Sequence, residues 1–487
     1  MKDFREKTIS GVAWNAVGQI GRQLVVLLSN VALARLLTPS DFGIIATAII
    51  FSNFAMTISE QGFLDALVQR QEVTEEHLSS IFWVNILTGA ILAALFFAGA
   101  PLLGRIYGEP ALAPVMRVIA AMFVIYPIGM VHKAVLTRGL AFRKIAAVEI
   151  SAAWIGGMTA IALAWMGVGV FSIALQFVVE FIVAAAALRL LCEWRPRFIL
   201  RWSAVRDLSS FSRNVFFSNI TGYWVRNIDN LLIGLYLGQY PLGLYSRAYA
   251  IMLFPISRVS WVFGRVLIRS FSIIQEDPAR IRCILLKISR AIALLTFPMM
   301  LGVAASADAF VACVFGGQWV EMVPVLRILA CVGMFQSVTS LTYSVYLARG
   351  RADLNLRVNL PFQLLQVAGI LLGLKWGILG VAMGYAATAL ISAPIVCRFA
   401  GGLIGLSVTG FFSNLKAIFF CAAAMALAVA GLDLLLPPEV GAVARMSVFI
   451  VSGAAVYWSL LRGFNVPGYR ELMDIVRERL PLLRGTA

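Results

Sequence analysis

Long apolar stretches alternate with short polar turns along almost the whole chain. Each stretch approaches the roughly 20 mostly apolar residues that cross a bilayer as a helix. The pattern predicts fourteen such helices, near residues 11–33, 42–64, 80–103, 115–137, 146–166, 170–191, 214–236, 244–271, 286–313, 321–348, 358–376, 378–397, 417–436 and 442–461. We therefore expect an all-α polytopic membrane protein with about fourteen transmembrane helices.

Composition narrows the class further. Hydrophobic residues make up 61% of the 487 residues and charged residues only 13%, with a mean hydropathy of +0.88. A soluble domain is nearer half apolar and a quarter charged, so the composition excludes a large soluble enzyme. The six cysteines show no CxxC spacing, and no Ser–His–Asp set or paired catalytic carboxylates emerge. We expect no catalytic residue, no metal site and no disulfide framework.

Lysine and arginine gather on alternate loops, on span ends and on both tails. The opposite set of loops carries only Arg35, Arg105, Lys375 and Arg445. Positively charged loops stay in the cytoplasm, so we expect both termini there. The net charge of +16 mostly reflects this asymmetry and does not indicate nucleic acid binding. The positive face is suited to anionic membrane lipids.

An offset of 200 residues brings two regions into register: residues 33–46 read LARLLTPSDFGIIA and residues 233–246 read IGLYLGQYPLGLYS. Gly43 then meets Gly243. The repeat predicts two six-helix lobes related by a pseudo-two-fold axis along the membrane normal, plus two C-terminal helices. We expect an N-lobe over 1–200, a C-lobe over 201–400, helices 13 and 14 over 401–465, and a cytoplasmic tail over 466–487. Chance similarity between two apolar hairpins is the alternative.

Three arginines, Arg22, Arg226 and Arg258, lie near the middle of predicted spans. A charge at that depth costs roughly 2.5–3.5 kcal/mol on insertion scales, and such residues usually face a water-filled cavity. Arg22 has no acidic residue one turn away on its own helix, which favours a cavity. Arg226 can pair with Asp229 three residues later, which would weaken it as a cavity charge.

Arg258 belongs to a basic stripe on the predicted helix over 244–271, which is made of Arg247, Arg258, Arg265 and Arg269. Anchoring at the cytoplasmic end of the helix explains Arg265 and Arg269, but Arg258 lies deeper. Pro255 removes a backbone hydrogen bond one turn earlier, so we expect the helix to bend near Arg258. A basic stripe beside a bend suits an anion site that opens to either side.

Uncharged polar side chains follow helical spacing on several other spans. They could line a cavity for a polar cargo, or they could hydrogen-bond neighbouring helices, and the two interpretations stay open. The candidates for substrate binding are Asn15, Gln19 and Asn30 on the first helix, Asn219 and Asn230 on the seventh, and Asn359 and Gln363 on the eleventh. Asn53 and Thr57 on the second helix also suit sugar hydroxyls.

Acidic residues inside the spans are candidates for coupling transport to a proton or a monovalent cation. They are Glu60, Glu180 and Asp229. An isolated carboxylic acid in the membrane is expected to be largely neutral. For Glu180, a structural acid hydrogen-bonded to a neighbour is the stronger alternative.

Four segments resemble bacterial polysaccharide-export flippases of the MOP superfamily: residues 33–46, residues 227–249 (NIDNLLIGLYLGQYPLGLYSRAY), residues 315–330 (FGGQWVEMVPVLRILA) and the turn over 349–351. The resemblance covers nearly the whole chain and is closest to exporters of colanic acid and succinoglycan-like exopolysaccharides. It implies a two-lobed flippase of the bacterial inner membrane. Such a protein carries an undecaprenyl-pyrophosphate-linked oligosaccharide from the cytoplasmic to the periplasmic leaflet by alternating access, for exopolysaccharide or lipopolysaccharide biosynthesis. No ATP site is implied, and no GxxxxGK[ST] loop occurs.

A cargo of this kind needs cations for its pyrophosphate and amide or hydroxyl partners for its glycan. We expect Arg22 and Arg258 to bind the pyrophosphate, with Arg226 third, and a polysaccharide polymerase and export machinery as partners. Two other functions stay open. A multidrug or small-cation exporter of the same superfamily should have an acidic or aromatic cavity, and a membrane-embedded polysaccharide polymerase or ligase should have a large periplasmic loop.

Overall fold

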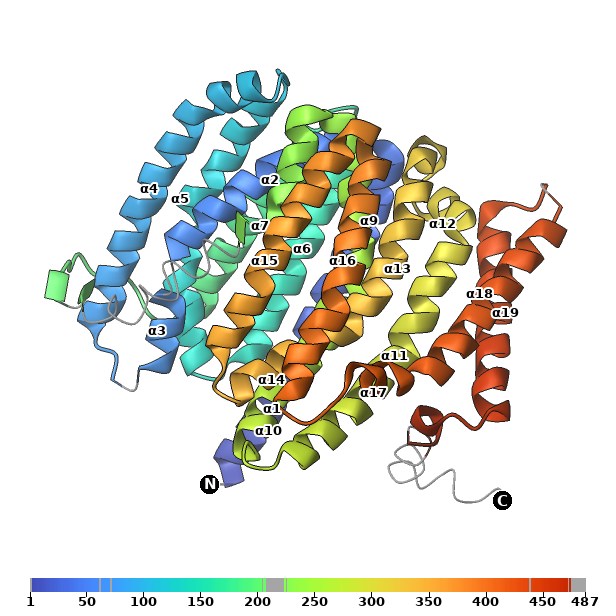
Figure 1. Cartoon of the computed structure of the whole chain (residues 1–487). Coiled ribbons are helices and arrows are strands. Elements are labelled where there is room, and N and C mark those ends of the chain that lie inside the picture. The colour runs from blue at the N-terminus through green and yellow to red at the C-terminus, as the bar shows by residue number, and fades with distance from the viewer. Residues whose placement is uncertain are drawn as a thin grey trace. The chain divides into compact units, whose positions relative to one another are not determined.

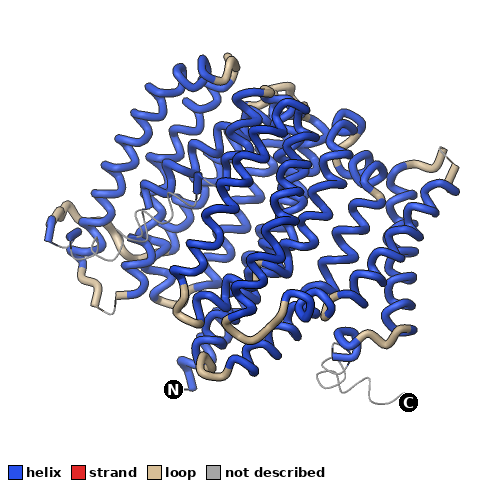
Figure 2. Tube along the Cα trace, viewed as in Figure 1, coloured by secondary structure: helices blue, strands red, loops and turns tan. Residues whose placement is uncertain are grey.

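The computed structural model describes residues 2–60, 63–70, 72–203, 205–206, 223–224, 226–437, 439–471 and 473, without the side chains of residues 2–10, 12–13, 60, 65, 261–262, 265 and 352. This part of the chain is almost entirely helical and contains no strand (Figure 2). Eleven of its segments are long and apolar enough to cross a membrane. The all-α polytopic fold is thus confirmed, whereas the number fourteen stays a prediction.

The chain divides into two compact units, Met1–Gly243 and Leu244–Ala487. The first unit contains the following labelled helices (Figure 1): α1 (Lys2–Leu36), α2 (Pro39–Glu60), α3 (Phe63–Gln69), α4 (Glu75–Ile106), α5 (Leu112–Arg138), α6 (Phe142–Trp165) and α7 (Phe171–Leu191). Helical residues 226–236 and the start of α9 (Gln239–Pro255) complete the described part of this unit. The lobe boundaries expected from the repeat stay predictions.

The second unit continues from α9 through a π-helical turn (Ile256–Ser260). Its further helices are α10 (Trp261–Ile273), α11 (Pro278–Ala305), α12 (Ala307–Val314), α13 (Val323–Thr339), α14 (Thr342–Ala348), α15 (Ala352–Gly373), α16 (Gly377–Gly402), α17 (Val408–Ser413), α18 (Lys416–Leu435) and α19 (Ala442–Gly463). Short 3-10 turns, Gly317–Met322 and Leu374–Trp376, precede α13 and α16.

The interruption expected beside Pro255 is present. The regular helix α9 ends at Pro255, and the π-helical turn that follows contains Arg258. Proline has no N–H to continue the ladder of backbone hydrogen bonds, and a locally widened helix is one way to accommodate that loss. The predicted single span over 244–271 is therefore two α-helices joined by a π-helical turn.

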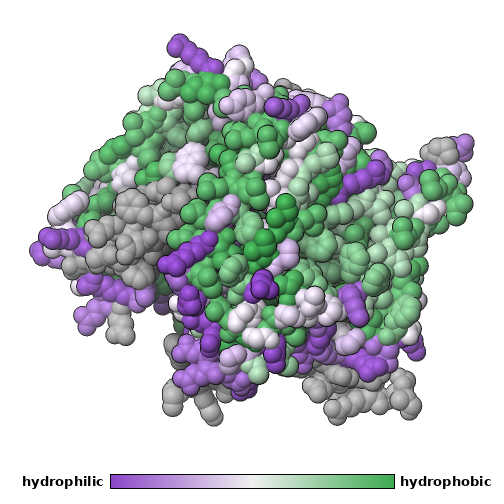
Figure 3. Space-filling model, viewed as in Figure 1, coloured by the Kyte–Doolittle hydropathy of each residue, from purple (hydrophilic) through white to green (hydrophobic). Residues whose placement is uncertain are grey.

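The membrane-facing character of individual helices is visible in their exposed side chains. The long outer face of α4 carries exposed apolar residues such as Leu87, Leu95 and Leu102, and α15 carries Leu356 and Leu364. In Figure 3 green, apolar side chains cover the middle of these helices, and purple, polar side chains gather near their ends. Side chains of this kind remain exposed in the folded chain because lipid, rather than water, is their solvent.

Candidate functional site

Two neighbouring glycines of α6 bring two other helices close to it in the first unit. A Cβ atom on Gly157 would lie 2.3 Å from the hydroxyl of Ser29 on α1, and one on Gly156 would lie 3.2 Å from the Cβ of Glu180 on α7. Small residues allow membrane helices to approach closely. The sequence of α6 therefore fixes α1 and α7 against adjacent faces of one helix.

This packing places Arg22 of α1 beside Glu180 of α7. Arg22 Nη2 donates a hydrogen bond to Glu180 Oε1 at 2.7 Å in an ion pair whose side chains are 49% and 14% exposed. The neighbour expected in the stronger alternative for Glu180 is therefore Arg22, which lies 158 residues away in sequence. The lack of an acidic residue one turn from Arg22 on its own helix could not reveal this partner, because Glu180 lies on another helix. A role of Glu180 in coupling stays a prediction.

The Arg22–Glu180 pair lies in the wall of two cavities of the first unit. One, of about 190 Å³, is lined by Tyr126, Lys133, Glu149 and apolar residues of α5, α6 and α7; we call it the Lys133 cavity. The other, of about 380 Å³, is lined by Asn53, Met56, Thr57, Met122 and Phe177; we call it the Asn53 cavity. Arg22, Glu180 and Phe181 line both.

A second ion pair lines the Lys133 cavity. Lys133 Nζ of α5 donates to Glu149 Oε1 of α6 at 2.7 Å. Two cations and two carboxylates therefore face this small space, so its formal charge is balanced. The Asn53 cavity has a different character, because Asn53 and Thr57 add uncharged polar groups next to Arg22.

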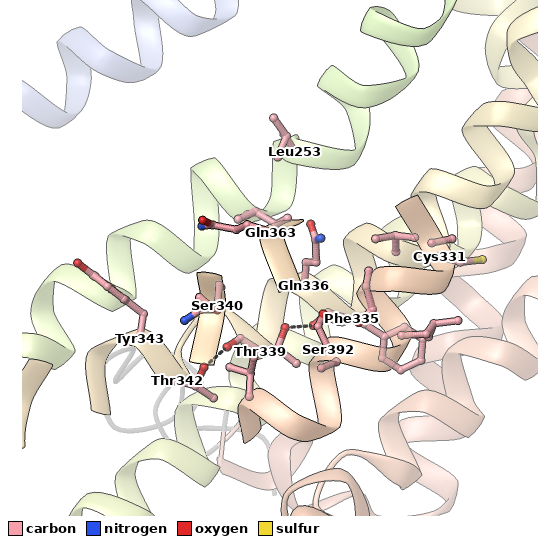
Figure 4. Close-up of a pocket in the computed structure, with 18 of the residues that line it drawn as sticks. Leu253, Cys331, Phe335, Gln336, Thr339, Ser340, Thr342, Tyr343, Gln363 and Ser392 are labelled. Atoms are coloured by element: carbon pink, nitrogen blue, oxygen red, sulfur yellow. Dashed lines mark hydrogen bonds between the residues drawn. The ribbon is translucent and has the colours of Figure 1, made fainter. Parts of the chain in front are cut away.

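The second unit contains a larger cavity, of about 800 Å³, between α13, α14, α15 and α16. Asn355, Asn359 and Gln363 of α15 line it, and we call it the amide cavity (Figure 4). Asn359 Nδ2 donates to Asn355 Oδ1 at 2.7 Å, which orients both amides. Among the lining residues the charged one is Arg327, which pairs with Asp308.

Several residues of the amide cavity were not expected from the sequence. They are Gln336, Thr339, Ser340, Thr342, Tyr343 and Ser392. Gln336 Nε2 donates to the hydroxyl of Tyr385 at 3.1 Å, and Thr342 Oγ1 donates to the Thr339 carbonyl. A signal was present, because the apolar span over 321–348 contains a dense run of hydroxyl and amide residues near its middle.

The structure does not gather the other predicted substrate residues around these cavities. On α1, Asn15 and Gln19 are exposed, and Asn30 donates to the Val26 carbonyl of its own helix. In the described part of the chain, Arg226 and Asn230 line neither cavity of the first unit, and Arg247 and Arg258 do not line the amide cavity. Asn219 and the side chains of Arg265 and Glu60 lie outside the described residues.

The predicted pair between Arg226 and Asp229 is not among the ion pairs formed by the described residues. Arg226 is exposed, whereas Asp229 is 2% exposed and its Oδ1 accepts a hydrogen bond from the N–H of Asn230 at 2.8 Å. Asp229 is therefore a buried acid whose carboxylate contacts the backbone of its own helix. Its role in coupling stays a prediction.

Comparison with known proteins decides the family. Residues 32–324 match the family model described as polysaccharide biosynthesis protein. The chain belongs to this family. A relative along nearly the whole length is the teichuronic acid biosynthesis protein TuaB of Bacillus subtilis, which is 27% identical over 95% of this chain and 96% of its own.

Solved structures show the same fold. The lipid II flippase MurJ in an inward closed conformation superposes with a TM-score of 0.73 at 14% identity, over 95% of this chain and 100% of that one. An inward-facing multidrug resistance MATE transporter of the MOP superfamily superposes with a TM-score of 0.61 at 14% identity, over 82% and 94%. These likenesses confirm the MOP-type fold of the polysaccharide biosynthesis family member described here.

Proposed function

We propose that this protein is a flippase for an undecaprenyl-pyrophosphate-linked oligosaccharide, which it moves from the cytoplasmic to the periplasmic leaflet by alternating access. Membership of the polysaccharide biosynthesis family supports a glycan cargo. The observation that most directly supports the proposal is the position of Arg22, a cation of α1 whose side chain lines both cavities of the first unit. A cation placed in this way can hold a phosphate within the membrane, where an unpaired charge is costly.

The amide cavity supplies a different kind of surface, which fits the uncharged part of the cargo. Its amides and hydroxyls can exchange hydrogen bonds with sugar hydroxyls, and its apolar residues can cover ring faces. We assign the glycan to this cavity and the pyrophosphate to Arg22. Arg258 remains a predicted anion ligand, placed on its π-helical turn.

Deletion of the gene tests the proposed function directly. We expect a lipid-linked oligosaccharide to accumulate on the cytoplasmic side and the surface or secreted polysaccharide to disappear, because the polymer cannot be built from a precursor on the wrong leaflet. Mass spectrometry of extracted lipids identifies the intermediate, and a plasmid copy should clear it. Normal lipid pools and normal polysaccharide in the deletion strain would refute the proposal.

A multidrug exporter is the second candidate, because the MATE transporter shares the fold. The lining of the cavities favours the flippase, because binding of a cationic drug needs acidic groups. The described lining of the amide cavity contains no carboxylate, and the acids of the Lys133 cavity are paired with Arg22 and Lys133. Dye-efflux assays in a pump-deficient strain separate the two, and strong dye resistance would reverse the order. The protein is not expected to be an enzyme.

Orientation, location and coupling form part of the same proposal. We place the chain in the bacterial inner membrane with both termini in the cytoplasm, because lysine and arginine gather on the tails and on the loops that share their side, and loops of this kind usually stay in the cytoplasm. A proton or a monovalent cation is proposed to drive turnover, with Asp229, Glu180 and Glu60 as coupling groups. A polymerase and export machinery are the proposed protein partners, and anionic lipids are proposed to bind the positive face.

The amide cavity gives a specific test on α15. Replacing Asn359 and Gln363 together by alanine removes two side chains that line the cavity, so we expect polysaccharide export to fall roughly tenfold, as the loss of two modest hydrogen bonds predicts. The control is Gln366→Ala, which changes an amide on the same helix that does not line the cavity. Polymer yield normalised to protein in the membrane is the measurement. Equal polymer yields from both variants would show that the amide cavity does not bind the glycan.

A further inference from the structure

We propose that Glu180 is an exchangeable counter-ion of Arg22: an anionic group of the cargo displaces it, and Lys133 then receives it. The inference rests on the proposed function, because it takes a phosphate-bearing cargo as the displacing anion. It assigns Glu180 a task in substrate binding that differs from that of a proton carrier. It also makes the Lys133 cavity part of the binding cycle.

The geometry of the pair leaves room for an incoming anion. Arg22 makes one hydrogen bond to a side chain of the described residues, from Nη2 to Glu180, although a guanidinium carries five N–H donors. Its side chain is 49% exposed and faces two cavities. An anion that enters the Asn53 cavity therefore meets a guanidinium with unused donors.

A pyrophosphate competes well for this cation. It carries more negative charge than one carboxylate, and its oxygens match the planar fork of a guanidinium in a bidentate arrangement. While no cargo is bound, Glu180 neutralises Arg22 and offsets the cost of a charge inside the membrane. The counter-ion thus stabilises the empty state without occupying all the donors of Arg22.

The released carboxylate needs a new partner, because a buried charge without one is strongly destabilising. Glu180 is 14% exposed, and Lys133 lines the same 190 Å³ cavity. Lys133 bonds Glu149 at 2.7 Å and is 41% exposed; its ammonium group has three N–H donors. Lys133 can therefore hold both carboxylates.

The exchange has a structural consequence within the first unit. The Arg22–Glu180 bond joins α1 to α7, and a Lys133–Glu180 bond would join α5 to α7 instead. Cargo binding would then loosen one helix contact and tighten another. A ligand shifts a conformational equilibrium only through such differential contacts, so the exchange couples recognition of the anion to rearrangement of these helices.

Binding measurements on the full-length purified protein test the exchange. The probe is farnesyl pyrophosphate, with farnesol as the uncharged control, titrated by calorimetry in detergent. We expect Glu180→Gln to bind the pyrophosphate roughly fivefold more tightly, the change expected when a partly exposed ion pair no longer competes. Arg22→Gln should lose the preference for pyrophosphate over alcohol. The double variant should behave as Arg22→Gln alone, because both residues act in one interaction.

Matched variants separate exchange from a general charge effect. Glu76→Gln removes an acid paired with Arg201 at 2.9 Å in the same unit and should leave the affinity unchanged. Glu180→Asp keeps the charge but is one methylene shorter, so it should also bind the probe more tightly than the native protein. A gain seen with glutamine and absent with aspartate would overturn the exchange.

The role of Lys133 is tested by measuring binding both in the native chain and in the Glu180→Gln variant. Lys133→Gln should weaken binding in the native chain, because the displaced carboxylate then has no receiving cation, and should have no effect when Glu180 is already glutamine. Weaker binding in both backgrounds would instead make Lys133 a direct ligand of the probe and remove its receiving role.

The outcomes also separate this inference from the proposed function. If Arg22→Gln abolishes pyrophosphate binding and Glu180→Gln brings no gain, the exchange is wrong and the anion site at Arg22 stands. If the native protein does not distinguish the pyrophosphate from the alcohol, the anion site fails and the exchange fails with it.

Discussion

Arg22→Gln is expected to abolish polysaccharide export while the protein still inserts into the membrane. The substitution keeps a polar side chain, which is shorter, but removes the charge that we assign to the pyrophosphate. The Arg22 side chain is 49% exposed, so we use the modest figure of about 1.5 kcal/mol for a hydrogen bond to a charged group, which corresponds to at least a roughly tenfold loss of transport. Export is measured as polymer yield in a deletion strain that carries the variant on a plasmid.

Three comparisons test whether a loss of export comes from the missing charge of Arg22 and not from a loss of inserted protein. Arg35→Gln changes an arginine in the last turn of the same helix and should leave export unchanged. Arg22→Lys retains the charge without the bidentate fork and should restore only part of the activity. Membrane-fraction immunoblots report insertion. Full export by Arg22→Gln at a normal protein level would remove Arg22 from the binding site.

The sequence was sufficient for features that depend on local pattern. Hydropathy located most of the spans, and the position of Pro255 predicted the interruption that places Arg258 on a π-helical turn. Both follow from chemistry within one helix: apolar length decides whether a segment enters lipid, and a missing N–H decides where the backbone ladder is broken. Asn359 and Gln363 were also assigned to a polar face that does line a cavity.

Features that depend on contacts between helices were not predictable in this way. Helical spacing shows which residues share a face, but it does not show which helix packs on that face. The hydrogen-bonding neighbour expected for Glu180 could therefore not be identified, although α6 brings Glu180 to Arg22 through Gly156 and Gly157. The same limit explains why Asn15 and Gln19, which share the predicted polar face with Arg22, do not line the Lys133 cavity, the Asn53 cavity or the amide cavity.

The offset of 200 residues also relates two close contacts of the first unit to each other. Within the first unit, a Cβ on Gly43 of α2 would lie 1.8 Å from the carbonyl oxygen of Gln239, and a Cβ on Gly243 would lie 1.8 Å from the carbonyl oxygen of Pro39. The two contacts exchange into each other when 200 is added to or subtracted from each number. The six-helix lobes and the axis that the repeat implies stay predictions.

The contact between residues 39–43 of α2 and residues 239–243 at the start of α9 is expected to tolerate no side chain at either glycine. Gly43→Ala and Gly243→Ala each place a methyl group 1.8 Å from a backbone carbonyl oxygen, so the helices must move apart. Thr47 Oγ1 and Gln239 Oε1, which lie 2.9 Å apart and are buried, would be separated too. Overpacking of this kind costs about 1–3 kcal/mol or more, and we expect both variants to lose most of their folded, monodisperse protein on mild heating.

The matched control is Gly99→Ala in α4, where a Cβ atom would meet no heavy atom within 4 Å. That variant should melt at the native temperature or slightly above it, because alanine favours a helix interior over glycine by about 1 kcal/mol. Fluorescence-detected size-exclusion chromatography after a temperature series gives the midpoints. If Gly43→Ala and Gly99→Ala have equal melting midpoints, the stability of the fold does not depend on glycine at position 43. A large loss confined to Gly43 and Gly243 would show that folding depends on the close backbone contact at these two glycines.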